Sequence, residues 1–235
     1  MDLKRFFIDE KITGNKVVLE GDEFYHAVKV TRHKVGFKII ICDNGDTDYY
    51  CKITEINKEN LVAEVEKEEK NTSETSRPVS LYIGINKDID TVVQKAVELG
   101  ISKIVPFTSR HGNIDTVNYD RLNKIILESS KQCGRSRLAR LEKVVPFNIA
   151  IEYAKNDNLL LFYEFETHNK VSDVVFNHEK PTSVFIGSEG GFSTEEIEYA
   201  RQHNAGVLTL GKRILRVSTA VVSALTLCLS RLGEM

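Results

Sequence analysis

Short apolar and β-branched runs alternate with turn residues along the first part of the chain, a pattern typical of a small β-rich module. The predicted strands cover Arg5–Ile8, Lys16–Leu19, Phe37–Cys42, Tyr49–Ile56 and Leu61–Val65. Asp43–Gly45 and Asn57–Asn60 consist mostly of turn-forming residues and predict hairpins. One helical segment, Asp22–Arg32, interrupts the strands.

A polar segment, Lys67–Pro78, follows this module and contains no hydrophobic residue. Its composition and its final proline are typical of a linker. We therefore predict an N-terminal module over residues 1–68 and a second domain over residues 77–235.

Beyond the linker, the hydrophobic pattern alternates between that of buried strands and that of amphipathic helices. The predicted strands cover Val79–Ile85, Lys103–Phe107, Leu159–Tyr163, Ser183–Ile186 and Val207–Leu210. The predicted helices cover Asp88–Leu99, Asn118–Gln132, a segment from the capping box Ser193–Glu196 to Asn204, and a C-terminal segment capped by Ser218 or Thr219. This alternation indicates an α/β domain with a mainly parallel sheet.

Two glycine-rich turns lie in the C-terminal part of the chain, Ile186–Phe192 and Leu210–Arg216, each between a predicted strand and a predicted helix. Their glycines bring bare backbone to the carboxyl ends of strands, where open α/β sheets bind their ligands. Neither turn has the spacing of a dinucleotide fingerprint or of a phosphate-binding loop. Glu189, between the glycines, favours a cationic or neutral ligand such as a sulfonium or an amine.

A flexible connection is the alternative interpretation of the first turn, and Arg213 and Arg216 in the second could simply cap carbonyl groups or pair with Glu189. However, the second turn ends the next predicted strand, and two loops at neighbouring strand ends can wall one crevice. We therefore favour a small-molecule site.

Composition and charge narrow the class of protein. The 235 residues are 41% hydrophobic and 28% charged, which is typical of a globular protein, and 32 basic against 34 acidic side chains give a formal charge of −2. Such a chain is no generic polyanion binder, so contacts with nucleic acid would depend on local basic patches. The four cysteines are scattered without metal-ligand spacing, which disfavours a metal site and a disulfide framework and predicts a cytoplasmic location. The charged N-terminus is no signal peptide, and the apolar stretch Val217–Ser230 is too short for a membrane span.

Both turns resemble the signature of the RsmE-type 16S ribosomal RNA uridine-N3 methyltransferases of the SPOUT superfamily. The family pattern Ile-Gly-Pro-Glu-Gly-Gly-Phe-Ser is matched by residues 186–193 except at Ser188. The pattern Leu-Gly-x-Arg-Ile-Leu-Arg-x-Glu-Thr-Ala is matched by residues 210–220 except at Ser218. Further segments that resemble the family are Gln94–Gly100, Gln132–Arg135 and His26–Arg32, so the resemblance covers nearly the whole chain.

The resemblance implies an N-terminal PUA-like β-barrel that helps to hold RNA, followed by a SPOUT α/β domain with a C-terminal trefoil knot. Simple topology rules disfavour such threading, and the hydrophobic pattern alone would not predict it. It further implies an S-adenosylmethionine-dependent enzyme that acts on small-subunit (16S) ribosomal RNA and works as a homodimer, without a metal ion or a membrane. Two alternatives stay open: a SPOUT methyltransferase with another target atom, and a catalytically silent RNA-binding factor in ribosome assembly.

Carried over by position, the resemblance implies three loops that bind S-adenosylmethionine. They contain Glu164; Gly187, Ser188, Glu189, Gly190 and Gly191; and Leu210, Gly211, Ile214, Leu215 and Thr219. Arg216 is the predicted catalytic residue, because a guanidinium beside the uracil carbonyl oxygens would stabilise the anion that develops as N3 attacks the methyl group. Ser218 stands where the family has a glutamate, so the proton acceptor would be Glu189, Glu164 or water.

Basic residues outside the turns predict contacts with RNA phosphates. The candidates are Lys29 and Arg32, on one face of the short N-terminal helix, together with Arg110, Arg135 and Arg137. The alternative for residues 131–140 is a solvated surface loop without a partner.

Overall fold

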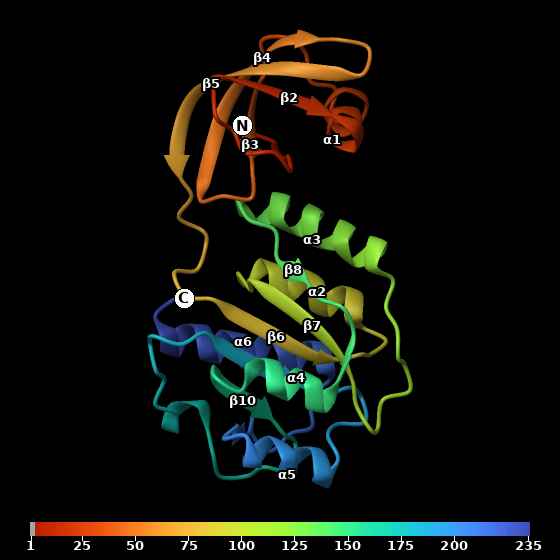
Figure 1. The fold of residues 1–235 in the computed structure, drawn as a ribbon, viewed down its shortest axis with the longest axis vertical. Coiled ribbons are helices and arrows are strands. Elements are labelled where there is room, and N and C mark those ends of the chain that lie inside the picture. Colours follow the sequence, from red (N-terminus) through yellow and green to blue (C-terminus); the bar gives the residue numbers. More distant parts are fainter. Residues whose placement is uncertain (1–2) are drawn as a thin grey trace. The chain divides into compact units, whose positions relative to one another are not determined.

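The computed structural model describes residues 3–235, and these form two compact units (Figure 1). The first unit comprises the residues up to Glu74 together with Leu127–Leu138. The second comprises Thr75–Ile126 and Ala139–Met235.

The first unit is built on a five-stranded sheet. Its strands are β1 (Arg5–Phe7), β2 (Lys16–Glu20), β3 (Lys38–Cys42), β4 (Thr47–Ile56) and β5 (Asn60–Lys70), in the order β1-β3-β4-β5-β2. β1 pairs parallel with β3, and the other neighbours are antiparallel. Register shifts within the β4–β5 pair mark bulges, which bend long strands. The predicted strands are confirmed, but the predicted linker is wrong over Lys67–Lys70, because these residues continue β5.

The predicted N-terminal helix is present in two parts, α1 (Gly21–Tyr25) and a π-helical turn, η1 (His26–Val30). The Thr31 hydroxyl ends it by donating toward the carbonyl oxygens of His26 and Ala27, both at 3.0 Å. Arg32 then adopts a left-handed conformation with φ of 57°. Lys29 and Arg32 therefore do not share one helix face, because Arg32 lies beyond the helix.

The second unit contains a seven-stranded sheet in which all recorded pairings are parallel, which confirms the predicted α/β class. Its strands are β6 (Val79–Gly84), β7 (Lys103–Thr108), β8 (Arg140–Leu141), β9 (Val145–Pro146), β10 (Asn158–Phe162), β11 (Thr182–Ile186) and β12 (Gly206–Leu208). The order is β12-β10-β11-β6-β7-β8, with β9 also paired to β7. Every residue of β6 and β11 is buried. Their sequences therefore consist of apolar and small residues and do not alternate between polar and apolar positions.

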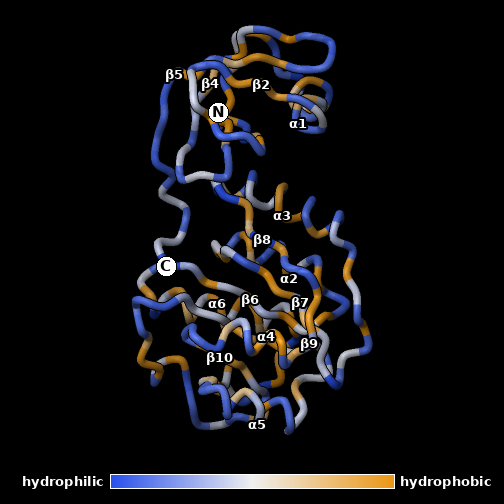
Figure 2. Tube along the Cα trace, viewed as in Figure 1, coloured by the Kyte–Doolittle hydropathy of each residue, from blue (hydrophilic) through white to orange (hydrophobic). Residues whose placement is uncertain are grey.

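Helices cover this sheet and complete its core (Figures 1 and 2). They are α2 (Ile89–Glu98), α4 (Phe147–Ala154), α5 (Thr194–Gln202), α6 (Val217–Leu232) and the short η2 (Val171–Asp173). The helix α3 (Tyr119–Cys133) is divided between the two units after Ile126. α4 and α5 pack on a cluster that includes the stacked rings of Tyr82 and Phe185, whose centroids lie 4.3 Å apart. α2 packs against α6, and α6 against β11. Sequence analysis did not predict α4.

Two helix starts were predicted from capping residues, with different outcomes. The capping box of α5 is confirmed, since the Ser193 hydroxyl accepts from the Glu196 amide at 3.2 Å and the Glu196 carboxylate accepts from the Ser193 amide at 2.8 Å. The predicted cap of α6 is wrong, because the helix begins at Val217 with Arg216 as its N-cap. Val217 is buried, so side-chain packing starts the helix earlier than serine or threonine preference suggests.

The strand order does not establish the predicted trefoil knot, which stays a prediction. Over residues 3–235, no helix has both the length and the apolar character needed to cross a membrane.

Candidate functional site

A cavity of about 460 Å³ lies within the second unit, a size typical of small-molecule sites. Its walls come from the segments that follow β6, β10, β11 and β12, which are neighbours in the sheet. All four strands are parallel, so their carboxyl ends meet at one edge. The cavity therefore occupies the place where open α/β sheets bind their ligands.

The glycine turn after β11 forms one wall. Gly191 closes it, with a left-handed φ of 67° and an amide that donates to the Ser188 carbonyl oxygen at 3.0 Å. A side chain at Gly190 would meet the Cβ of His111 at 2.7 Å, so the loop after β7 packs directly on this turn. The glycines are needed because backbone from two loops approaches too closely for a Cβ atom.

Two carboxylates lie between this turn and its neighbours. The Glu189 carboxylate accepts a hydrogen bond from the Lys87 amide at 2.8 Å, which joins the loops after β11 and β6. The Glu164 carboxylate, from the loop after β10, lies so close to Gly191 that a Cβ atom there would overlap it. The hydrogen bond of Glu189 thereby joins two loops of the cavity, and Glu164 brings the third loop into close approach at Gly191.

The second glycine turn, after β12, forms the opposite part of the lining. The Thr209 hydroxyl accepts from the Gly211 amide at 3.0 Å, and Gly211 has a φ of 104°. Ile214 is 82% exposed, and Arg216 precedes the first residue of α6. This wall combines bare backbone, apolar surface and a guanidinium.

The structure brings most of the predicted cofactor residues together. Those that line the cavity are Glu164, Gly187, Ser188, Glu189, Gly191, Leu210, Gly211, Ile214 and Leu215, along with Arg216. Gly190 and Thr219 are not part of the lining. Gly190 instead faces His111, and Thr219 is exposed in the first turn of α6.

Sequence analysis missed the wall formed by Lys87 and Asp88, which follow β6. No glycine motif marks this loop. The available signal was the predicted strand Val79–Ile85, because the rule that ligands gather at strand carboxyl ends applies to it as well.

Several charged side chains of the lining have no partner among the residues that the structure describes. Within residues 3–235, the structure gives no hydrogen bond or ion pair for the side chains of Lys87, Asp88, Glu164, Arg213 and Arg216. The alternative that Arg213 and Arg216 pair with Glu189 is therefore wrong. These positive and negative side chains can therefore bind a ligand that itself carries a positive and a negative group.

The predicted RNA-binding residues have different surroundings. Lys29 and Arg32 are exposed on the first unit. Arg110 donates from its amide to Glu196 at 3.0 Å, and its guanidinium lies 3.3 Å from Glu195. The Arg137 guanidinium is half-exposed and pairs with Asp46.

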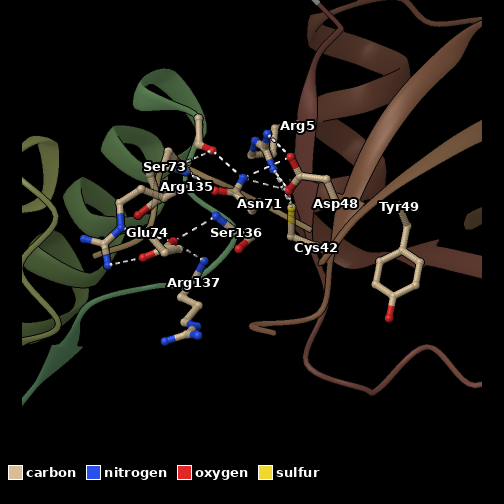
Figure 3. A network of polar contacts seen from close by, with 12 residues as sticks. Arg5, Cys42, Asp48, Tyr49, Asn71, Ser73, Glu74, Arg135, Ser136 and Arg137 are labelled. Carbon is tan, nitrogen blue, oxygen red and sulfur yellow. Dashed lines mark hydrogen bonds and ion pairs between the residues drawn. The ribbon is translucent and has the colours of Figure 1, made fainter. Parts of the chain in front are cut away.

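The prediction for Arg135 needs correction, because its side chain is only 3% exposed and pairs with Glu74 at 3.0 Å (Figure 3). The Glu74 carboxylate also accepts from the amides of Ser136 and Arg137, at 3.0 and 2.9 Å. The guanidinium thus stabilises the first unit instead of facing an RNA phosphate.

A second buried group adjoins this pair in the same unit (Figure 3). Arg5 pairs with both oxygens of Asp48, and the Asn71 amide donates to the same carboxylate at 3.0 Å. Burial alone would raise the pKa of Asp48, but the hydrogen bonds from Arg5 and Asn71 outweigh it and hold the pKa below its usual value. Burial raises the pKa of the neighbouring Cys42 thiol to about 12, so Cys42 is no nucleophile at neutral pH.

Metal ligands do not gather anywhere in the described part of the chain: no three His, Cys, Asp or Glu side chains there could together hold an ion.

Comparison with known families and structures identifies the class. The model of an RNA methyltransferase domain matches residues 73–229, and that of an RNA methyltransferase PUA domain matches residues 19–66. The fold is that of a crystal structure of ribosomal RNA small subunit methyltransferase E from Neisseria gonorrhoeae bound to S-adenosyl methionine, with a TM-score of 0.89, 24% identity and 98% of each chain covered. The protein is thus an RNA methyltransferase with an N-terminal PUA-like domain.

Curated relatives specify the family. The chain is 30% identical to ribosomal RNA small subunit methyltransferase E of Rickettsia conorii, over 96% of this chain and 94% of that protein. It is 29% identical to the protein of the same name from Aquifex aeolicus, over 95% of this chain and 98% of that protein. The chain therefore belongs to the ribosomal RNA small subunit methyltransferase E family.

Proposed function

We propose that this protein uses S-adenosylmethionine to methylate N3 of one uridine in 16S ribosomal RNA of the small subunit. The observation that carries the proposal is the cavity at four strand ends, in which an unpaired guanidinium, Arg216, stands among bare backbone and unpaired carboxylates. The names of the relatives and their ligand support the same substrate and methyl donor.

The cavity fits S-adenosylmethionine, which supplies an electrophilic methyl group on a sulfonium when bound. Its volume suits a nucleoside-sized ligand, and Glu164 and Glu189 provide the negative charge that a sulfonium favours. The residues that would hold the donor are the backbone groups of Gly187, Gly191, Leu210 and Gly211 and the apolar side chains of Ile214 and Leu215.

Arg216 would act on the acceptor. N3 of uracil attacks well only as its proton leaves, and the negative charge then spreads onto the two neighbouring carbonyl oxygens. A preorganised guanidinium stabilises that charge where it develops, which is typically worth a factor of about 10²–10³ in rate.

The first unit would hold the RNA. Lys29 and Arg32 are exposed, and the aromatic side chains Tyr25 and Phe37 nearby in sequence are 61% and 49% exposed. A surface that combines cationic side chains with exposed aromatic rings is typical of proteins that bind single-stranded RNA. Arg110 and Arg137 are further candidates, and we propose residues 1–68 as the RNA-holding domain and residues 77–235 as the methyltransferase domain.

Two further predictions concern the oligomeric state and the location of the protein. We propose a homodimer, which the family resemblance implies and light scattering tests. The expected location is the cytoplasm, where ribosomal RNA is found.

Exchange of Arg216 for alanine tests the proposal. We expect Arg216→Ala to lower methylation of undermethylated small subunits by about 10²–10³-fold, while calorimetry shows S-adenosylmethionine still bound. Mass spectrometry of the nucleosides identifies the methylated atom. A wild-type protein that methylates another atom, or binds the donor without turnover, would replace the proposal by one of the alternatives.

A further inference from the structure

Asp88 is a cavity residue that the sequence motifs did not reveal. It follows β6, precedes α2 and lines the cavity beside Lys87. Aspartate at this N-cap position usually accepts a hydrogen bond from the first turn of its helix. Asp88 makes no such bond, and its φ of −93° and ψ of 16° differ from the extended conformation of a capping residue.

Asn86 performs the local bonding instead. Its side-chain oxygen accepts from the Asp88 amide at 2.9 Å, and its side-chain nitrogen donates to the Gly84 carbonyl oxygen at 2.9 Å. Asn86 is buried, whereas Asp88 is exposed to the cavity side of the loop. The Asp88 carboxylate is thus not engaged in holding the helix or the loop.

Arg216 enters the same cavity in the equivalent position of another helix. It is the N-cap residue of α6, and α6 packs against α2. Two packed helices that both begin at the cavity therefore present a guanidinium and a carboxylate there. Ser218, in the first turn of α6 and half-buried, stands where the resembling family pattern has a glutamate. Ser218 does not line the cavity, whereas Asp88 at the start of α2 does.

The other carboxylates of the lining have different placements. Glu189 accepts from the Lys87 amide and serves to join two loops. Glu164 lies against Gly191 and follows β10, which is separated from β6 by β11 in the sheet. Of the three, Asp88 alone is carried by a helix that packs against the helix of Arg216. The cations in the lining are Lys87, Arg213 and Arg216.

We propose that Asp88 accepts the N3 proton of the target uridine, an inference that rests on the proposed function. The proton passes from N3 to a carboxylate oxygen of Asp88. The N3 electron pair forms a bond to the methyl carbon as the methyl–sulfur bond breaks and leaves its electrons on sulfur. The protonated Asp88 then returns the proton to water. Arg216 stabilises the uracil anion from the other helix.

The test compares Asp88→Asn with Asp90→Asn, the same exchange two residues later on α2. Asp90 pairs with the exposed Arg121 and does not line the cavity. General-base catalysis contributes about 10²–10⁴-fold, so we expect Asp88→Asn to lose about 10²-fold or more in kcat at neutral pH, and Asp90→Asn to match the wild type. Circular dichroism establishes that both variants fold.

Two readouts separate proton transfer from a structural role. We expect calorimetry to give Asp88→Asn the S-adenosylmethionine affinity of the wild type within about twofold. We also expect its deficit in kcat to shrink as pH rises toward the range in which uracil N3 ionises without a base.

Three results would overturn the assignment: a wild-type rate for Asp88→Asn, a deficit of constant size at every pH, or loss of donor binding by more than about tenfold. A wild-type protein that forms no N3-methyluridine would instead overturn the proposed function. The wild-type assay, made first, distinguishes the two failures.

Discussion

The buried charges of the first unit and the cavity charges of the second unit are used in opposite ways. In the first unit, the ion pairs Arg5–Asp48 and Arg135–Glu74 are buried, with no side chain among them more than 9% exposed. In the second unit, the cavity is lined by charges that have no partner within the described residues, such as Arg216 and Asp88. The buried pairs of the first unit bind each other within the fold, whereas the charges that line the cavity can bind a ligand.

This difference follows from the energetics of burial. A charge removed from water must be paired and hydrogen-bonded, so a buried pair is costly to break by removing one partner. A charge at the wall of an open cavity keeps its hydration until a ligand replaces the water. The basic segment 131–140 shows that counting charges in a sequence does not distinguish the two uses.

Exchange of one arginine in each unit should give the largest contrast. Arg5→Met leaves the buried Asp48 carboxylate without its cation, and we expect the free energy of unfolding of the first unit to fall by about 3–5 kcal/mol. Arg213→Met removes an unpaired, exposed charge and should change stability by no more than about 0.5 kcal/mol. Urea titrations followed by circular dichroism measure both. Equal effects would remove the distinction between the two units.

Exchange of one left-handed glycine in each unit should have a smaller effect on stability but a selective effect on binding. Gly191→Ala and Gly134→Ala each place a Cβ atom at positive φ, which costs roughly 1–2 kcal/mol. Only at Gly191 would that atom also displace Glu164, since nothing lies within 4 Å at Gly134. We therefore expect only Gly191→Ala to weaken S-adenosylmethionine binding in calorimetry. Equal affinities would show that Glu164 and this turn do not contact the donor.

Local patterns in the sequence were sufficient for the strands and for most helices. The capping box at Ser193 and the buried runs of β10 and β11 are properties of neighbouring residues, and they were predicted correctly. Three walls of the cavity were found because glycine turns and the family resemblance mark them. The fourth wall, formed by Lys87 and Asp88, has no such sequence motif. It can be identified only from the sheet order, which places β6 beside β11.

Long-range contacts account for what the sequence could not predict. Arg135 is 61 residues from Glu74, and no local pattern distinguishes it from a surface arginine. Lys67–Lys70 look like a linker because every side chain is polar, yet their backbone pairs with β4. The start of α6 depends on burial of Val217, which is again a tertiary effect.

Acid should weaken the first unit through Asp48. Its pKa is lowered in the folded state, so this carboxylate contributes stability above its unfolded pKa of about 4, and the contribution is lost as pH falls through the folded value. We expect the urea midpoint of the first unit to fall on acidification below about pH 4. In Arg5→Met that part of the pH dependence should shrink, because the main cation that lowers the pKa is gone. An unchanged profile in the variant would mean that other carboxylates dominate acid unfolding.

A small change in stability is also expected at Arg137, whose ion pair with Asp46 is about half-exposed. Exposed pairs contribute little, so Arg137→Ala should alter the free energy of unfolding by less than about 1 kcal/mol. If Arg137 binds a phosphate, the same exchange should weaken RNA binding and reduce the dependence of log affinity on log salt by about 0.7–0.9. Arg201→Ala, which removes a similarly exposed guanidinium from its pair with the largely buried Glu166, is the control and should leave that salt dependence unchanged. An equal salt dependence of RNA affinity in the two variants would show that Arg137 does not bind an RNA phosphate.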